Sequence, residues 1–185
     1  MSSVHASIGE LEAGLAEIRR SPAAAGRVEL IVRRPREDER EVIATGVIDE
    51  REGLLGDCWL TRGSGSTPDG SANPDAQLTL MGSRAARLIA GDHDRWPLAG
   101  DQLFVDFDLS NANAPPGTRL EVGGALLEVT AAPHLGCGKF ARRFGVDAAK
   151  FVNSRTGRSM NLRGVNARVL RGGPVATGDA IRKLV

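Results

Sequence analysis

Cys137 is the residue whose neighbours most clearly point to chemistry. It stands between a β-like run and a short helical pattern, and four cationic or potentially cationic side chains lie within six positions of it: His134, Lys139, Arg142 and Arg143. A thiol at the start of a helix and beside positive charge is partly ionised near neutral pH. Because the thiolate is the nucleophile and the soft-metal ligand, we expect a reactive or metal-binding cysteine. The alternative is a buried cysteine that packs as a small apolar residue.

Two neighbours of Cys137 have candidate roles. His134 could orient the thiolate or shuttle protons, and its alternative role is that of a loop histidine that caps the helix start. Lys139 is a candidate anion ligand. Arg142 and Arg143 point in different directions on a helix, so at most one of them faces the site. A zinc site is not expected at Cys137, because no second pair of ligands has the required spacing.

The charge of the chain is unevenly distributed. The stretch from Pro133 onward has eleven Lys or Arg and two Asp, although the whole chain has a net charge of only +1. This end of the chain could bind an anion, or it could pair with the acidic remainder of the protein. Nucleic acid is a poor candidate partner, because the chain has no Tyr and only 4% aromatic residues, and no helix-turn-helix or zinc-finger spacing occurs.

The first half of the chain begins with a helical pattern. Ser7 and Glu10 form a possible capping box, and apolar residues continue at helical spacing as far as Ile18. Residues 28–32 and 41–48 are rich in β-branched residues and predict a hairpin around a charged loop. Residues 61–75 are rich in Gly, Ser, Pro and Asp, which predicts a long loop.

The second half alternates short strands and short helices. Strands are expected at 77–81, 103–107, 118–122, 125–131, 165–170 and 180–185, and helices at 83–90, 137–145 and 147–153. Gly123 and Gly124 separate two alternating runs, which is a strong hairpin signal. The pattern favours a mainly β, barrel-like α+β fold with short helices and an N-terminal helix.

Composition bounds the class of protein. With 185 residues and 41% hydrophobic residues, the chain is long enough for one domain with a real core. No apolar stretch is long enough to span a bilayer, and the first residues lack the apolar region of a secretory signal. Two cysteines do not make a disulfide framework, so we expect a cytoplasmic, reduced protein without a membrane partner.

Several blocks of sequence, taken in order, resemble the MOSC domain, which is named for the C-terminal domain of molybdenum cofactor sulfurases. The resemblance is to stand-alone bacterial members and runs from about Val28 to the C-terminus. The blocks are Gly53–Asp57, Gln77–Met81, Ala99–Val105, Pro115–Gly123, Leu127–Thr130, the Cys137 segment, Asn161–Val169 and Gly178–Ile181. The expected domains are therefore an N-terminal helical extension, residues 1–26, and a MOSC-like β-barrel, residues 27–185.

The resemblance implies both a fold and a cofactor. Members are barrel-like domains with one characteristic cysteine, matched here by Cys137, that holds sulfur as a persulfide or ligates the molybdenum of a pterin cofactor. Relatives reduce N-hydroxylated compounds. The pyridoxal-phosphate domain of the eukaryotic sulfurase is absent, so no pyridoxal-phosphate site is expected. One departure is that many relatives have Arg-His or similar basic residues after the Gly-Leu-X-Gly-Asp block, where this chain has Cys58-Trp59-Leu60.

The resemblance also suggests further cofactor-binding residues. Arg163 and Arg168 suit a phosphate group through their planar guanidinium groups, and Asn161 could bond a pterin edge. Asp57 could contact the cofactor or substrate, or its side chain could stabilise the turn in which it lies. Cys58 is expected to be structural, with a second thiol that resolves a persulfide on Cys137 as the alternative.

Three functions follow. The first is a molybdenum-pterin protein that uses Cys137 as metal ligand and reduces N-oxygenated substrates with a redox partner. The second is a carrier that accepts sulfur on Cys137 from a cysteine desulfurase and delivers it to a metal-sulfur assembly or cofactor. The third is a non-catalytic binding module in which residues 61–75 form the partner surface.

Overall fold

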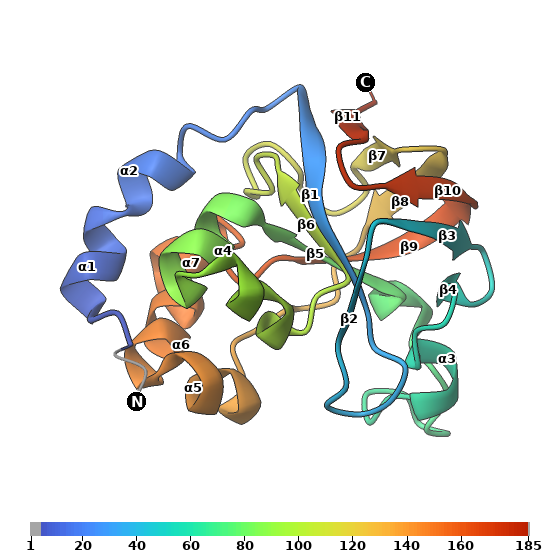
Figure 1. Ribbon diagram of the computed structural model, residues 1–185, viewed down its shortest axis with the longest axis horizontal. Coiled ribbons are helices and arrows are strands. Elements are labelled where there is room, and N and C mark those ends of the chain that lie inside the picture. The colour runs from blue at the N-terminus through green and yellow to red at the C-terminus, as the bar shows by residue number, and fades with distance from the viewer. Residues whose placement is uncertain (1–4, 185) are drawn as a thin grey trace.

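The computed structural model describes residues 5–184 and places a closed β-barrel beside a layer of helices (Figure 1). Within those residues seven strands close the barrel in the order β11-β7-β8-β9-β5-β6-β1, and β1 pairs back with β11. Neighbouring strands are antiparallel except for β5 and β6, which are parallel. The strands are β1 (Ala25–Arg33), β5 (Leu78–Gly82), β6 (Leu103–Asp106), β7 (Arg119–Val122), β8 (Ala125–Val129), β9 (Val165–Arg171) and β11 (Ala180–Lys183).

The β7–β8 hairpin shows why local sequence predicts this barrel. Buried and partly exposed residues alternate along β8, as expected for a strand with one face in the core. The turn is Gly123-Gly124, as predicted, and Gly123 has φ of 56°. A side chain at Gly123 would also meet Asp179, with a Cβ 2.6 Å from Oδ2. Glycine is therefore needed there for both conformation and space.

A small second sheet lies beside the barrel and differs from the expected hairpin. β2 (Glu41–Ile43) pairs with β1 as predicted, but β3 (Thr45–Asp49) leaves it and pairs with β4 (Gly53–Leu54) and β10 (Gly173–Ala176). Residues 173–176 are not among the expected strands. In the structure β10 is an edge strand paired only with β3 in its sheet, a position where Pro174 is tolerated.

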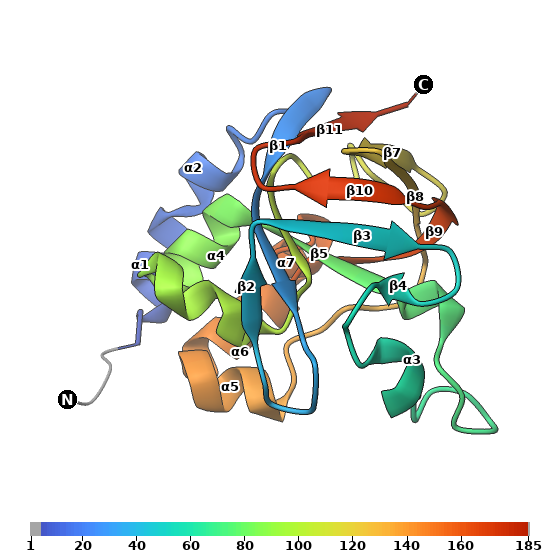
Figure 2. The same ribbon diagram turned by 45° about the vertical axis from the view of Figure 1, so that its right-hand side comes forward.

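Helices cover one side of the barrel (Figures 1 and 2). They are α1 (Ile8–Ala13), α2 (Leu15–Ile18), α4 (Ser83–Ala90), the 3-10 helix η2 (His93–Ala99), α5 (Gly138–Phe144), α6 (Val146–Asn153) and α7 (Arg155–Ser159), while α3 (Trp59–Arg62) and the 3-10 helix η1 (Pro74–Ala76) belong to the long loop. Helices account for about as much of the chain as strands. No helix in residues 5–184 has the length and apolar character needed to cross a membrane.

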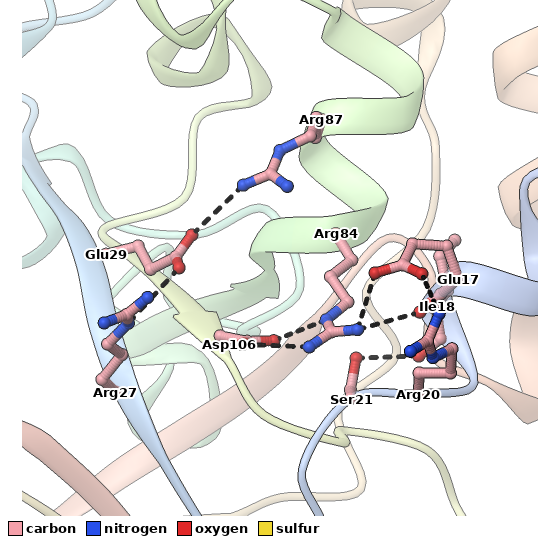
Figure 3. A network of polar contacts seen from close by, with 9 residues as sticks. All are labelled: Glu17, Ile18, Arg20, Ser21, Arg27, Glu29, Arg84, Arg87 and Asp106. Carbon is pink, nitrogen blue, oxygen red and sulfur yellow. Dashed lines mark hydrogen bonds and ion pairs between the residues drawn. The ribbon is translucent and has the colours of Figure 1, made fainter.

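The predicted N-terminal helix is present in two pieces. The Ser7–Glu10 capping box is confirmed at the start of α1. Gly14 separates α1 from α2 and packs against Leu88 of α4, where a Cβ would lie 2.4 Å from Cδ1. Ion pairs then attach α2 to the barrel (Figure 3): Arg84 of α4 binds Asp106 of β6 at 2.7 Å and Glu17 of α2 at 2.8 Å.

The molecule has two hydrophobic cores. One fills the barrel and includes Val28, Leu80 and Leu127. The other lies between the barrel wall and the helices and includes Leu11 and the aromatic residues Trp96, Phe104, Phe140, Phe144 and Phe151. α5 therefore packs through Phe140 and Phe144 onto the barrel wall, and this fixes the residues at its start.

Candidate functional site

A cavity of about 340 Å³ opens where the β1–β2 loop (residues 34–40), the start of α5 and α3 meet. In both ribbon views that loop hangs between α5 and α3 (Figures 1 and 2). Two thiols line the cavity, Cys58 and Cys137. Seven cationic side chains line it as well, against only two carboxylates, Glu37 and Asp38. The cations are Arg34, Arg36, Arg40, Arg62, Lys139, Arg143 and Arg163.

Cys137 is exposed at the start of α5, and its backbone is extended just before the first helical turn. Partial burial opposes ionisation of the thiol, but the backbone N–H groups of Phe140 and Lys139 and the charge of Arg163 outweigh it. The pKa of Cys137 is therefore lowered from its ordinary value. Cys58, by contrast, is buried and precedes α3. The start of the helix lowers this pKa as expected, but the charge that contributes is that of Arg163 and not that of the near neighbours along the chain.

Asp101 connects two of the predicted residues. Its fully buried carboxylate accepts a hydrogen bond from Arg163 Nη1 at 2.6 Å, and its other oxygen lies 2.7 Å from His134 Nε2. Burial opposes its ionisation, but the Arg163 charge and the His134 contact together hold the pKa of Asp101 far below its usual range. Burial and the Arg163 charge lower the pKa of His134. The site thus has an ionised Asp101 and a neutral His134 whose Nε2–H donates to it.

Arg163 reaches the cavity from the turn before β9. Its Nη2 donates to the Ala99 carbonyl at 2.8 Å, and its guanidinium lies over the Phe140 ring at 5.1 Å. Its Nε is buried without a hydrogen-bond partner among the described residues. This arginine is rigidly held beside α5, which explains its effect on the thiol of Cys137.

Arg34 lines another part of the cavity and is held by Asp57. Arg34 Nε and Nη2 each donate to an Asp57 oxygen at 2.8 Å, and Nη1 donates to the Gly100 carbonyl at 3.0 Å. Asp57 also accepts from the backbone N–H of Trp59 at 2.9 Å. The carboxylate of Asp57 is fully buried behind the cavity lining. It thus orients Arg34 and the turn rather than facing the cavity.

Lys139 and Arg143 lie on the cavity side of α5, whereas Arg142 is not among the lining residues. Lys139 Nζ pairs with Glu37 at 2.6 Å, and Arg143 Nη2 pairs with Asp38 at 2.8 Å. Of the two adjacent arginines, one therefore faces the cavity, as helical geometry requires.

Asn161 and Arg168 are not brought to the Cys137 cavity. The Asn161 amide donates to the Leu109 carbonyl at 2.8 Å and so joins two loops elsewhere. Arg168 of β9 lies opposite Glu128 of β8 and pairs with it at 2.6 Å. Both side chains are occupied by structural contacts, so neither contributes to the anion-binding surface around Cys137.

Sequence reasoning assigned no role to Asp101, Arg34 or Arg40. Asp101 lies in the Ala99–Val105 block. Only its acidic type and its place in that block could have indicated a role in the site. Arg40 is half-buried and donates to the carbonyls of Pro97 and Glu39. Burial, followed by the charges of Arg143 and Arg34, lowers the pKa of Arg40. Such crowding of positive charge marks a place where an anion would be stabilised.

Comparisons with known proteins support this fold. A family model described as MOSC domain matches residues 74–182. This is narrower than the resemblance from Val28, and it leaves the β1–β2 loop outside the match. No curated protein matches this chain.

Solved structures similar to the chain include the YuaD protein from Bacillus subtilis, with 18% identity, a TM-score of 0.58, and coverage of 85% of this chain and 94% of that one. YiiM from Escherichia coli has 19% identity and a TM-score of 0.56, covering 86% and 70%. YiiM from Geobacillus stearothermophilus has 16% identity and a TM-score of 0.53, covering 88% and 74%. At this level of identity the likeness concerns the fold.

Proposed function

This chain belongs to the MOSC domain family, and from that premise we propose that it binds a molybdenum-pterin cofactor with Cys137 as the protein ligand to the metal. The holoprotein would reduce N-oxygenated substrates with electrons from a partner protein. The observation that supports this most is the position of Cys137, an exposed thiol with a lowered pKa at the edge of a cationic cavity.

The residues of the cavity fit such a group. A thiolate is a soft ligand suited to a redox-active metal, and guanidinium groups suit phosphate. Within the described residues, no three side chains of His, Cys, Asp or Glu form a metal site. A metal held by Cys137 would therefore take its other ligands from the pterin. Arg40 and Arg62 line the cavity and make no ion pair with the described residues. Their positive charge is therefore left for the phosphate of the pterin.

The chain's own residues have distinct tasks in this proposal. The bound cofactor would supply two-electron chemistry at the metal. Lys139, Arg143 and Arg40 would bind the anionic part of the ligand. Reduction of an N-hydroxyl group to N–H consumes two electrons and two protons and releases water, so the site needs a proton carrier. His134, whose Nε2–H is held by Asp101, would accept a proton at Nδ1 and release it to the substrate.

The proposed setting is the cytoplasm. Both cysteines are free, and one of them is an exposed thiol with a lowered pKa, which a reducing compartment would preserve. The partner would be an electron-transfer protein that approaches the open side of the cavity.

Metal content tests the proposal directly. We expect protein from a host that makes the cofactor to contain molybdenum, measured by inductively coupled plasma mass spectrometry. Cys137→Ser should lose most of the metal, since it removes the only thiol of this pair that is exposed. Cys58→Ser, at the buried thiol of the same cavity, is the matched control and should keep the metal. Equal molybdenum in wild type and Cys137→Ser, or none in folded wild-type protein, would contradict the proposal.

The exposed thiol also supports a second candidate, a sulfur carrier. The Cys137 thiolate would attack the outer sulfur of a desulfurase persulfide, form a persulfide on Cys137 and release the desulfurase thiolate. Incubation with a cysteine desulfurase and cysteine should add the mass of one sulfur atom to the peptide that contains Cys137. No adduct on that peptide would remove this candidate.

A further inference from the structure

Two acidic residues at the tip of the β1–β2 loop reach cations that line the Cys137 cavity. Glu37 Oε1 lies 2.6 Å from Lys139 Nζ, and Asp38 Oδ1 lies 3.4 Å from the same nitrogen. Asp38 also pairs with Arg143 Nη2 at 2.8 Å. The nearby charges of Lys139, Arg143 and Arg40 lower the pKa of Asp38, with that of Lys139 the largest cause. Carboxylates of the chain itself thus occupy the place that an anionic ligand would take.

These ion pairs differ from the other two in the cavity wall. The Glu37 and Asp38 side chains are 72% and 59% exposed, whereas Asp57 and Asp101 are fully buried behind Arg34 and Arg163. Exposed ion pairs contribute little to stability, because water and salt screen them. A buried pair cannot be broken without leaving an unpaired charge in the interior. The wall is therefore fixed, and the contacts of the loop tip are displaceable.

Side-chain hydrogen bonds at both ends of the loop restrict movement to its tip. Arg34 anchors one end through Asp57 and the Gly100 carbonyl, and Arg40 anchors the other through the Pro97 carbonyl at 3.1 Å. Between them Asp38 has φ of 61°, a left-handed conformation that Asp and Asn adopt more readily than most residues. Glu37 and Asp38 can therefore leave Lys139 and Arg143 while the ends of the loop stay in place.

Positive charge remains in excess even with the tip in place. Arg40 and Arg62 make no ion pair with the described residues, and the charges of Arg34 and Arg143 crowd Arg40. A ligand with a single negative charge would carry less charge than the two carboxylates that it displaces. A ligand with two or more negative charges would replace them and also neutralise part of this excess.

We propose that Glu37 and Asp38 act as an internal competitor that admits to the cavity only ligands with at least two negative charges, such as a phosphate ester or a pyrophosphate group. The inference rests on the proposed function for the use of this cavity, and adds the residues that select the ligand. The loop lies outside residues 74–182, the part of the chain that the family model matches.

Isothermal titration calorimetry of the full chain with pyrophosphate and with nitrate tests this selection. The variant is Glu37→Gln/Asp38→Asn, in which Asn keeps the left-handed backbone at position 38. Wild type should bind pyrophosphate and show no detectable nitrate binding. The double variant should bind pyrophosphate about tenfold more tightly and should gain nitrate binding, since three weak ion pairs no longer compete. In wild type, pyrophosphate should increase hydrogen exchange at residues 36–39.

Glu39→Gln is the matched control. Glu39 lies in the same loop, but among residues 5–184 its carboxylate pairs only with Arg36, at 3.5 Å, and it does not line the cavity. This variant should change pyrophosphate affinity about twofold at most. The proposal is overturned if the double variant binds pyrophosphate no more tightly than wild type, if pyrophosphate leaves hydrogen exchange in the loop unchanged, or if neither protein binds it. Because the probe contains no metal or pterin, such a failure is distinguishable from an absence of molybdenum, which bears on the proposed function alone.

Discussion

Asp101 is the residue on which the arrangement of the site most depends. Its buried carboxylate holds Arg163 and contacts His134. We expect Asp101→Asn to lower the free energy of unfolding by about 3–5 kcal/mol, because it leaves the buried Arg163 without a counter-ion. Urea denaturation followed by circular dichroism measures this loss.

Asp106→Asn is the control for that measurement. Asp106 also pairs with an arginine, Arg84, but both side chains are partly exposed. The loss there should be about 1 kcal/mol or less. Equal losses of unfolding free energy in the two variants would mean that the buried Asp101–Arg163 pair contributes no more to stability than the partly exposed Asp106–Arg84 pair.

Among single residues, the sequence predicts best those site residues that lie near Cys137 along the chain. His134, Lys139 and Arg163 all line its cavity, and the first two are its near neighbours along the chain. Asp101 is 62 positions from Arg163, and Arg34 is 23 positions from Asp57. Contacts at such separations follow from strand pairing, which the composition of either segment does not specify. The same reason explains why Arg168, a plausible anion ligand by type, lies beside Glu128 instead.

Among the elements, α1 offers the clearest test of how the helical layer is held. Leu11 is fully buried in the core shared by the helices and the barrel wall. Leu11→Ala should lower the free energy of unfolding by about 2–4 kcal/mol, through lost burial and the cavity left behind. Ile8→Ala, at a residue of the same helix that is 39% exposed, should cost less than about 1 kcal/mol. Similar values for both would contradict the burial of Leu11 in that core.

The elements that could be predicted are those with a clear period or a specific turn. The strand at 78–82, the helix at 83–90 and the Gly123-Gly124 hairpin lie close to their expected limits. α7 and β10 were not predicted, and each contains a residue that argues against it locally. Gly157 lies inside α7, where a Cβ would be 2.2 Å from the Phe151 carbonyl oxygen, and Pro174 lies in β10. Packing against the rest of the protein, and not local sequence, therefore determines the conformation of both segments.

The division of the chain into an N-terminal extension, residues 1–26, and a barrel domain, residues 27–185, stays a prediction.

The whole molecule should become less stable as pH falls below neutrality. The pKa of folded His134 is lowered by burial and by Arg163, so the unfolded chain binds a proton more readily than the folded one. Stability is therefore constant above the unfolded histidine pKa, about 6.5, and falls below it by at most about 1.4 kcal/mol per pH unit. Asp101 adds a second loss only in strong acid, as pH falls below the ordinary aspartate pKa.

Urea denaturation between pH 7.5 and 5.5 measures this dependence. His134→Gln, which keeps a donor for Asp101 at the position of Nε2, should flatten it. His93→Gln is the matched control, at an exposed histidine whose ring lies tilted against Trp96 with the ring centroids 4.6 Å apart. A wild-type slope that persists in His134→Gln would show that other groups cause it.

The pairing of β1 with β11 has a consequence for the order of events during synthesis. Residues 25–27 form the last seam of the barrel with residues 180–182, so the circle of strands cannot close until the latter have left the ribosome. Contacts so distant along the chain form slowly, because a long loop must be ordered first. The nascent chain therefore has an open strand edge for most of its translation, and during that interval it depends on protection from aggregation.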